Sequence, residues 1–350
     1  MGLWITPQEE LTGATLPCMS SFSVERSSCR PAASMAEWIR RGVPRGTLVG
    51  PGFEPTTYGY YRRAGALPTT AQRITDVVAG LPEGAWIAGW AAAYVHGVDR
   101  LDGLDDHTMA KLPIPVLLPP GQRRRTTSGI SYRQSTLIPR GEVVEGIPVT
   151  TALRTALDLA LLAPDLTEAV VALDAILAAR MLTHDRLQRA GAKLPPRRGA
   201  RQARAAIGLA RAGTRSTWES RLRMFAGQQL GLVDLEVNRP VFDPEGRLLG
   251  IPDLLDLEAG LAMEYDGATW RAERTAGHRD RAQHREDNER EERLERAGLV
   301  VVRVEKDDLT HYQRKLTERI SAAQEDGLRR DRTRDRWTID KPEGWLGLPA

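Results

Sequence analysis

The stretch Leu261-Ala262-Met263-Glu264-Tyr265-Asp266 decides the fold of the C-terminal part of this chain. Its apolar and acidic side chains alternate, and successive side chains of a β-strand point to opposite faces of a sheet. Leu261, Met263 and Tyr265 are therefore expected on a core face. Ala262, Glu264 and Asp266 share the opposite face. The alternation predicts a strand that carries two carboxylates on one side.

A third carboxylate, Asp253, follows Pro252 on the strand predicted to come before. Carboxylates held side by side repel one another unless a cation or a proton lies between them. Oxygen ligands of this kind suit a hard divalent cation. We therefore expect Asp253, Glu264 and Asp266 to bind Mg²⁺ or Mn²⁺. The alternative is a set of exposed strand acids beside a glycine turn.

The composition is that of a globular protein with two domains. The chain has 350 residues, of which 27% are charged and 41% hydrophobic, and this length is long for a single core. The net charge is only +3, but arginines cluster. Clustered arginines favour phosphate backbones, although a solvated surface explains them equally well. The clusters lie at Arg123–Arg125, Arg197–Arg204 and Arg211–Arg223.

Cysteine usage and apolar runs bear on location. Cys18 and Cys29 are too few for a disulfide framework or a metal site, so we expect a cytoplasmic protein. No apolar run approaches the roughly 20 residues that span a bilayer, and no membrane role is expected. Residues 1–34 lack a signal-peptide pattern and are predicted to be a disordered tail. Met35 opens a better-patterned segment and is an alternative start, which mass spectrometry of the native N-terminus would test.

The pattern divides the chain into two units. Residues 35–195 read as one mixed α+β domain, 196–213 as an Arg-rich connecting helix, 214–325 as a second domain and 326–350 as a basic extended tail. In the second domain Ser216 and Glu219 predict a capped helix. Strands at 235–242, 248–257 and 261–266 follow. A polar helix at 278–297, an apolar strand at 299–304 and a last helix complete the order α-β-β-β-α-β-α.

The second domain resembles a known family of nucleases. The string of Ser216-x-x-Glu219, Pro252-Asp253, Glu264-Tyr265-Asp266-Gly267, a polar helix and an apolar strand with Arg303 carries the resemblance. It is similar to the endonuclease-like domain related to very-short-patch repair endonucleases, within the PD-(D/E)xK superfamily. The resemblance implies a restriction-endonuclease-like α-β-β-β-α-β core at the C-terminus of an α/β protein.

The first domain resembles the C-terminal region of the AbiEi type IV antitoxin. The matching stretches are 90–97, 146–150 and 154–158. The winged-helix head usual in that family is not evident in the sequence. The resemblance implies an antitoxin-like α+β domain, with a toxin or defence-system partner.

Roles follow from the nuclease resemblance. Asp253 matches the metal-binding acid and Glu264 the second acid. Glu219 matches the acid borne by the first helix, although its capping role alone explains it. Asp266 stands in the place of the usual Lys, where it could add a metal ligand or act as a base but could not stabilise the attacked phosphate.

The following helix could replace the missing cation. His278 and His284 lie there, with Asp287 on the face of His284, and the resemblance implies general acid or base work. A solvated, salt-bridged helix face is the alternative. Arg303 is expected to pair with one of the acids or to contact DNA. Arg215, Arg221, Arg223 and Arg303 are the candidate DNA-binding residues.

These features predict a Mg²⁺-dependent DNA endonuclease or nickase, serving phage defence or DNA repair, with Asp253, Glu264, Asp266, Glu219, His278 and His284 as the candidate catalytic residues. The alternative is a non-catalytic, DNA-binding transcriptional regulator or antitoxin-like protein that keeps a degenerate nuclease fold. A protein-interaction module without DNA binding is the third possibility.

Overall fold

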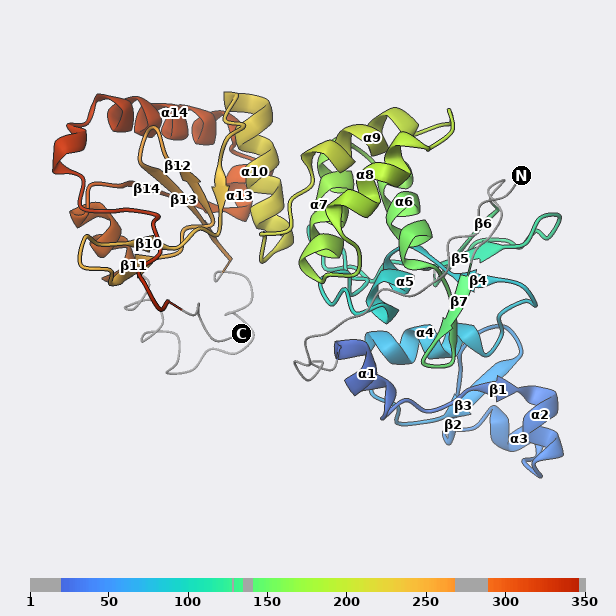
Figure 1. Ribbon diagram of the computed structural model, residues 1–350. Coiled ribbons are helices and arrows are strands. Elements are labelled where there is room, and N and C mark those ends of the chain that lie inside the picture. The colour runs from blue at the N-terminus through green and yellow to red at the C-terminus, as the bar shows by residue number, and fades with distance from the viewer. Residues whose placement is uncertain (1–19, 128, 135–140, 268–288, 346–350) are drawn as a thin grey trace.

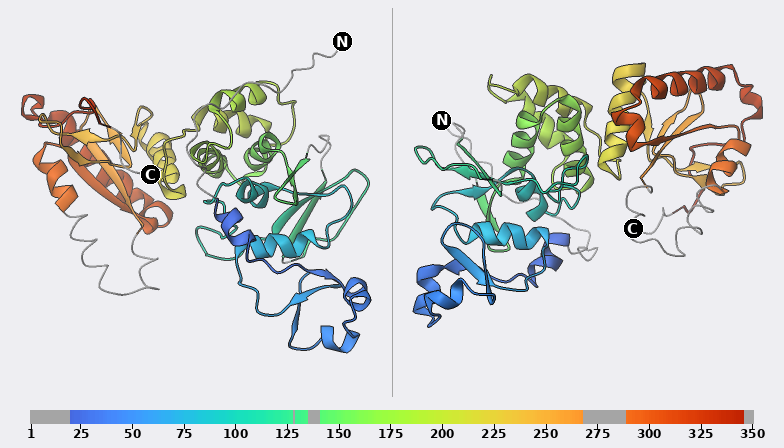
Figure 2. Two further views of the ribbon diagram at one scale, coloured as in Figure 1. Left: turned by 60° about the horizontal axis from the view of Figure 1, so that its bottom comes forward. Right: turned by 180° about the vertical axis from the view of Figure 1, so that it is seen from behind.

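The computed structural model describes residues 20–127, 129–134, 141–267 and 289–345. It has two lobes (Figures 1 and 2), each mixed in helices and strands. The N-terminal lobe holds a small head, a five-stranded sheet and a helical bundle. The C-terminal lobe holds a four-stranded sheet with helices on it, and helix α10 lies where the lobes meet.

The head is a helix-turn-helix, whose two helices the sequence did not reveal, followed by a hairpin that the glycines and tyrosines of residues 46–61 indicate. Its three strands form an antiparallel sheet in the order β1-β3-β2. The turn between α2 and α3 covers four residues and contains Gly42 at φ 82°, as is typical of this motif. The elements are α1 (Ser21–Arg26), β1 (Ala33–Ser34), α2 (Met35–Arg40), α3 (Arg45–Leu48), β2 (Phe53–Pro55) and β3 (Tyr60–Arg63).

The predicted disordered tail is wrong for residues 20–34. Helix α1 is capped by Ser20, whose side chain accepts a hydrogen bond from Ser23 N. Phe22 is fully buried and its ring meets the Tyr94 ring edge-on at 6.1 Å. One buried aromatic side chain contributes about 1.5–3 kcal/mol, and hydrogen bonds from Ala71 N to Glu25 and from Arg30 N to Gln72 also hold this segment on the lobe. Residues 1–19 lie outside the described residues.

The antitoxin-like region begins with a five-stranded sheet in the order β6-β5-β4-β8-β7. Helix α5 ends at His96, whose Nε2 lies 2.9 Å from Thr150 O at the end of β8. The sheet therefore holds the start of the helical bundle. The elements are α4 (Thr70–Val78), β4 (Trp86–Ile87), α5 (Gly89–Val95), β5 (Ile114–Leu118), β6 (Ile130–Gln134), β7 (Gly141–Val144) and β8 (Ile147–Thr150).

Four helices form the bundle, and the predicted connecting helix is one of them. Residues Ala203, Ala206 and Ile207 of α9 are buried in the same core as α6 and α7. Small side chains on one face of α9 allow this close packing, so the segment belongs to the N-terminal lobe. The helices are α6 (Ala152–Leu162), α7 (Leu166–Ala178), α8 (His184–Ala192) and α9 (Ala200–Leu209).

The C-terminal lobe is built on a sheet in the order β14-β13-β12-β9. The predicted strand 261–266 is confirmed as β13, which pairs in parallel with β14 and antiparallel with β12. Leu261 and Met263 pack on one face with α10 and α14, while Ala262 packs on the other with Leu294. The elements are α10 (Thr217–Leu230), β9 (Glu236–Val237), β12 (Leu254–Asp256), β13 (Leu261–Asp266) and β14 (Val300–Glu305).

Two predicted strands are each broken in the middle. The segment 235–242 divides into β9 and β10 (Val241–Phe242), and the segment 248–257 divides into β11 (Leu248–Gly250) and β12. Asn238 sits at the first break with φ 48° and donates its backbone N–H to Asp253 O. Pro252 lies at the second break and has no N–H for a ladder. The breaks place Asp253 at the start of β12.

The predicted extended tail is largely part of the lobe. Helix α13 spans Lys306–Thr310, α14 spans Gln313–Arg329 and a short 3₁₀ helix spans Arg332–Arg334. Thr338 exchanges two backbone hydrogen bonds with Phe242, each of 2.8 Å. Trp337 and Ile339 pack against the core beside β10. Apolar burial therefore holds this segment, while residues 346–350 lie outside the described residues.

Candidate functional site

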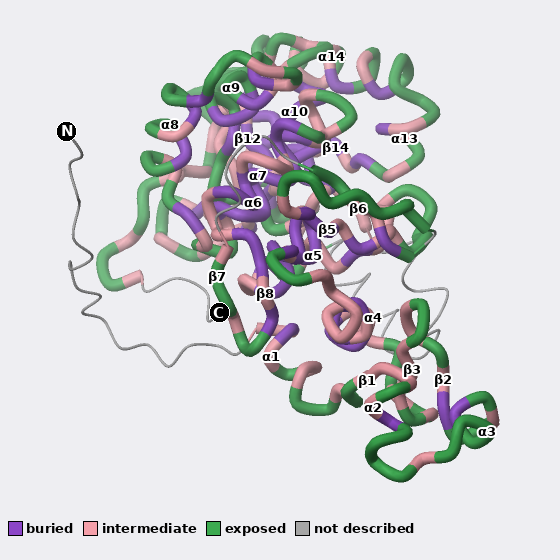
Figure 3. Tube along the Cα trace, turned by 90° about the vertical axis from the view of Figure 1, so that its right-hand side faces the viewer, coloured by how far each residue is buried: buried purple, intermediate pink, exposed green. Residues whose placement is uncertain are grey.

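Helix α10 is buried on two sides because it belongs to both lobes. Trp218, Leu222 and Phe225 pack on the C-terminal sheet. Met224 packs into the core of the bundle. In Figure 3 the segments labelled α7, α10 and β12 are largely coloured as buried. The lobes are therefore held together by a shared helix that packs into both hydrophobic cores.

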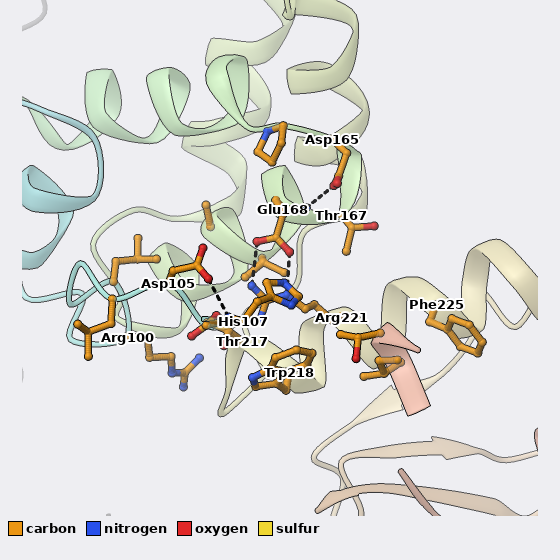
Figure 4. A pocket seen from close by; sticks show the side chains of 18 of the residues that line it. Arg100, Asp105, His107, Asp165, Thr167, Glu168, Thr217, Trp218, Arg221 and Phe225 are labelled. Atoms are coloured by element: carbon orange, nitrogen blue, oxygen red, sulfur yellow. Dashed lines mark hydrogen bonds and ion pairs between the residues drawn. The ribbon is translucent and has the colours of Figure 1, made fainter. Parts of the chain in front are cut away.

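Two predicted DNA-binding arginines pair across this junction. The Arg221 guanidinium donates to both carboxylate oxygens of Glu168, at 2.7 and 2.8 Å, and to Asp106 at 2.8 Å. Arg223 donates to Asp174 at 2.8 Å. Figure 4 shows Arg221 held between the lobes. In this arrangement neither side chain is open to a phosphate, because the pairing carboxylates already hold both.

An aromatic series continues from the junction toward the acidic strand. The His107 ring lies edge-on to Trp218 at 5.1 Å, and Trp218 stacks on Tyr265 at 5.6 Å with the planes 6° apart. Lys306 donates to the backbone oxygens of Asp106 and His107. A cavity of about 570 Å³ lies beside this series, between the lobes. Its rim carries more carboxylates than guanidinium groups, and most of those carboxylates already accept hydrogen bonds.

Asp253 is the most strongly perturbed carboxyl in the predicted site. Its Oδ2 accepts a hydrogen bond of 2.7 Å from Tyr265 N, which ties β12 to β13. Burial, with smaller contributions from the nearby charges of Glu219 and Glu264, raises the pKa of Asp253 to about 7. The structure therefore brings together three of the predicted site residues, Glu219, Asp253 and Glu264.

Glu264 is buried and paired with an arginine that the sequence did not single out. Only 6% of the residue is exposed. Its Oε2 accepts a hydrogen bond of 3.0 Å from Arg290 Nη2. Its Oε1 is buried without a hydrogen-bond partner among the described residues. One carboxylate oxygen of Glu264 therefore has a charged hydrogen-bond donor, and the other has no donor among the described residues.

Glu219 has a complete structural role of its own. Ser216 Oγ accepts from Glu219 N, as predicted, and Glu219 Oε2 accepts from Arg215 N at 2.7 Å. The same carboxylate oxygen accepts from Asn238 Nδ2 at 2.7 Å. Glu219 thus joins the start of α10 to the break between β9 and β10. Its side chain accepts from Arg215 N rather than from Ser216 N, so half of the predicted capping box is present, and these structural contacts are sufficient for Glu219.

The predicted metal ligands do not assemble as a three-ligand site. Within the described ranges, no group of three His, Cys, Asp or Glu side chains is placed to hold a metal ion. Asp266 ends β13 opposite Glu305, and a guanidinium already occupies one oxygen of Glu264. As arranged, these residues do not fit a divalent ion. His278, His284 and Asp287 lie outside the described residues.

The remaining predicted DNA-binding residues differ in environment. Arg303 pairs with Glu291 at 2.5 Å, an acid of the helical segment described at residues 289–296. Arg215 is exposed at the start of α10. Of the four candidates, Arg215 alone presents an exposed side chain.

Sequence reasoning missed the exposed residues of the head. Arg45 is exposed on α3 and has no hydrogen-bond or ion-pair partner within the part of the chain described here. Tyr58 is fully exposed in the turn between β2 and β3. Trp38, Leu48 and Phe53 form the core of the head, and their irregular spacing gave no sequence signal.

Comparisons with known proteins address the N-terminal lobe. Residues 85–209 match the family model of the AbiEi antitoxin C-terminal domain. No curated protein matches the chain. The crystal structure of the RV2827C protein from Mycobacterium tuberculosis is similar at 17% identity and a TM-score of 0.35, over 57% of this chain and 78% of that chain. No helix of the described residues is long and apolar enough to cross a membrane. The match supports the predicted antitoxin-like region over residues 85–195 and extends it through α9, which the sequence predicts as a separate connecting helix.

Proposed function

We propose that this chain is a DNA-binding regulatory protein of the antitoxin type, acting with a toxin or defence-system partner. The helix-turn-helix that precedes the antitoxin-like region carries the proposal. In such motifs the second helix enters the major groove while the first helix crosses the backbone. The C-terminal lobe serves as a non-catalytic part of the same protein.

The charge of the head supports this function. Residues 30–66 contain six Arg and two Glu, which gives the segment a net charge of +4. Leu48 is buried while Arg45 and Thr47 of the same helix are exposed. Arg63 is exposed on β3, over the ring of Trp38. The exposed arginines are therefore carried on a small hydrophobic core, and a basic surface of this kind attracts the phosphates of DNA.

Arg45→Glu is expected to weaken binding to a labelled DNA duplex about tenfold or more and to lower the slope of log K against log salt by about 1. The physical reason is the loss of one phosphate contact and the gain of one repulsive charge. Fluorescence anisotropy over a NaCl series measures both. Arg314→Glu, an equal charge change on exposed α14, is the control and should retain wild-type affinity. Equal affinities of wild type and Arg45→Glu would contradict the proposal.

Metal-dependent DNA cleavage by the C-terminal lobe is the second candidate function, and it needs Arg290 to leave Glu264. The clustering of Glu219, Asp253 and Glu264 favours it, together with the order of β9, β12, β13 and β14. Incubation of supercoiled plasmid with the protein and Mg²⁺ or Mn²⁺ tests it. Under the antitoxin-type proposal the plasmid stays intact. Nicking that Asp253→Ala abolishes would establish the nuclease instead.

A further inference from the structure

The polar face of β13 is covered by a helix whose arginine reaches the buried glutamate. Residues 290 and 294 are one helical turn apart and lie on one face of the helix. Residues 262 and 264 are alternate residues of β13 and also share a face. Leu294 packs in the core cluster of Ala262, and Arg290 pairs with Glu264. The helix therefore lies along this strand, with an apolar contact at one end and an ion pair at the other.

The end of β11, which belongs to the separate β10-β11 sheet, leaves room for the arginine stem. β11 ends at Gly250, where an added Cβ would lie 3.3 Å from Arg290 Cγ. Because Gly250 has no side chain, the backbone passes close to the aliphatic part of Arg290, and this contact helps to orient the guanidinium toward Glu264. Its charge also acts on Asp253, whose pKa it lowers against the stronger effect of burial.

We propose that the Arg290 guanidinium is the resident cation of this acid pocket, and that it holds the place of a hard divalent cation, for which the pocket is a latent site. A buried carboxylate needs a compensating charge, and Arg290 is the cation paired with Glu264 in the structure. The orphaned Glu264 Oε1 and the carboxyl of Asp253 are the oxygens that a divalent ion would use once the guanidinium is gone. This inference deepens the non-catalytic role proposed for the C-terminal lobe and rests on it.

Calorimetric titration of the full chain with Mn²⁺ alone tests the inference. Arg290→Gln is expected to bind one Mn²⁺ at least tenfold more tightly than wild type, and Arg290→Gln with Glu264→Gln is expected to lose that gain. Arg293→Gln is the matched control. It removes the same charge one turn along the helix, where Arg293 donates to Leu249 O outside the pocket, and it should bind Mn²⁺ as wild type does. Arg290→Lys keeps a cation and should also stay at the wild-type affinity.

Either of two results would overturn the inference. One is a folded Arg290→Gln protein, or a folded Arg290→Met protein that keeps the apolar stem, with no gain in Mn²⁺ affinity. The other is a rise in the wild-type unfolding temperature with Mn²⁺ that Glu264→Gln abolishes. The second result would also remove the non-catalytic role of the lobe, whereas the first would leave it standing. DNA binding by the head is measured separately through Arg45.

Discussion

Asp174→Ala is expected to destabilise the protein by about 3–5 kcal/mol, the usual effect of removing one partner of a buried ion pair. Asp174 is fully buried on α7. It accepts hydrogen bonds from Arg223 of α10 at 2.8 Å and from Arg211 N at 2.7 Å. Without the carboxylate, the Arg223 guanidinium and the Arg211 N–H both lose a partner at the junction of the lobes. Urea unfolding followed by circular dichroism measures the change.

Two further variants serve as controls for that result. Asp185→Ala breaks the pair with Arg189, whose side chains are both 69% exposed, and is expected to cost no more than about 1 kcal/mol. Asp174→Leu combined with Arg223→Met replaces the pair by apolar groups and should recover much of the lost stability. An Asp174→Ala protein no less stable than Asp185→Ala would show that the pair does not hold the lobes together.

Asp253→Asn is expected to stabilise the protein by up to about 4 kcal/mol above pH 7. Burial raises the pKa of Asp253 from 3.8 to about 7. Between these values the folded protein keeps a proton that the unfolded chain releases. The folded state then binds more protons than the unfolded state, so wild-type stability falls as pH rises through this window. Asn does not ionise and still offers an oxygen to Tyr265 N–H.

The measurement is the free energy of unfolding of both proteins at about pH 5 and pH 8. The advantage of Asn should grow across this range, because the cost of ionising buried Asp253 is complete only above its folded-state pKa. Asp185→Asn, at an exposed position, should change stability by a few tenths of a kcal/mol at both pH values. If Asp253→Asn stabilised the protein by the same amount at both pH values, the raised pKa of Asp253 would be refuted.

Much of the C-terminal lobe could be predicted because its elements are periodic or capped. The alternation of β13, the Ser216 cap of α10 and the apolar run of β14 each express a local rule. The prediction of long strands at 235–242 and 248–257 failed at Asn238 and Pro252. There a positive φ and a missing N–H break the ladder, and tertiary hydrogen bonds compensate at both breaks.

The two helices of the head could not be predicted for a different reason. Helix α3 has four residues and β1 has two, so neither is long enough to show a period. Only their shared core of Trp38, Leu48 and Phe53 reveals them as a unit. Short elements of this kind are defined by contacts between them, which a single sequence does not display.

The sequence by itself determined where the acids lie, which strand carries them and which face of that strand they share. Only the tertiary structure determined which side chains contact these acids. Arg290 lies 26 residues from Glu264 in the sequence and reaches it only because a helix covers that face of β13. Arg221 and Arg223 looked like surface arginines because charge and spacing are the same for a solvated helix and for one buried between two lobes. Local sequence fixes which groups a segment presents, whereas the partner of a buried charge is set by packing across the whole chain.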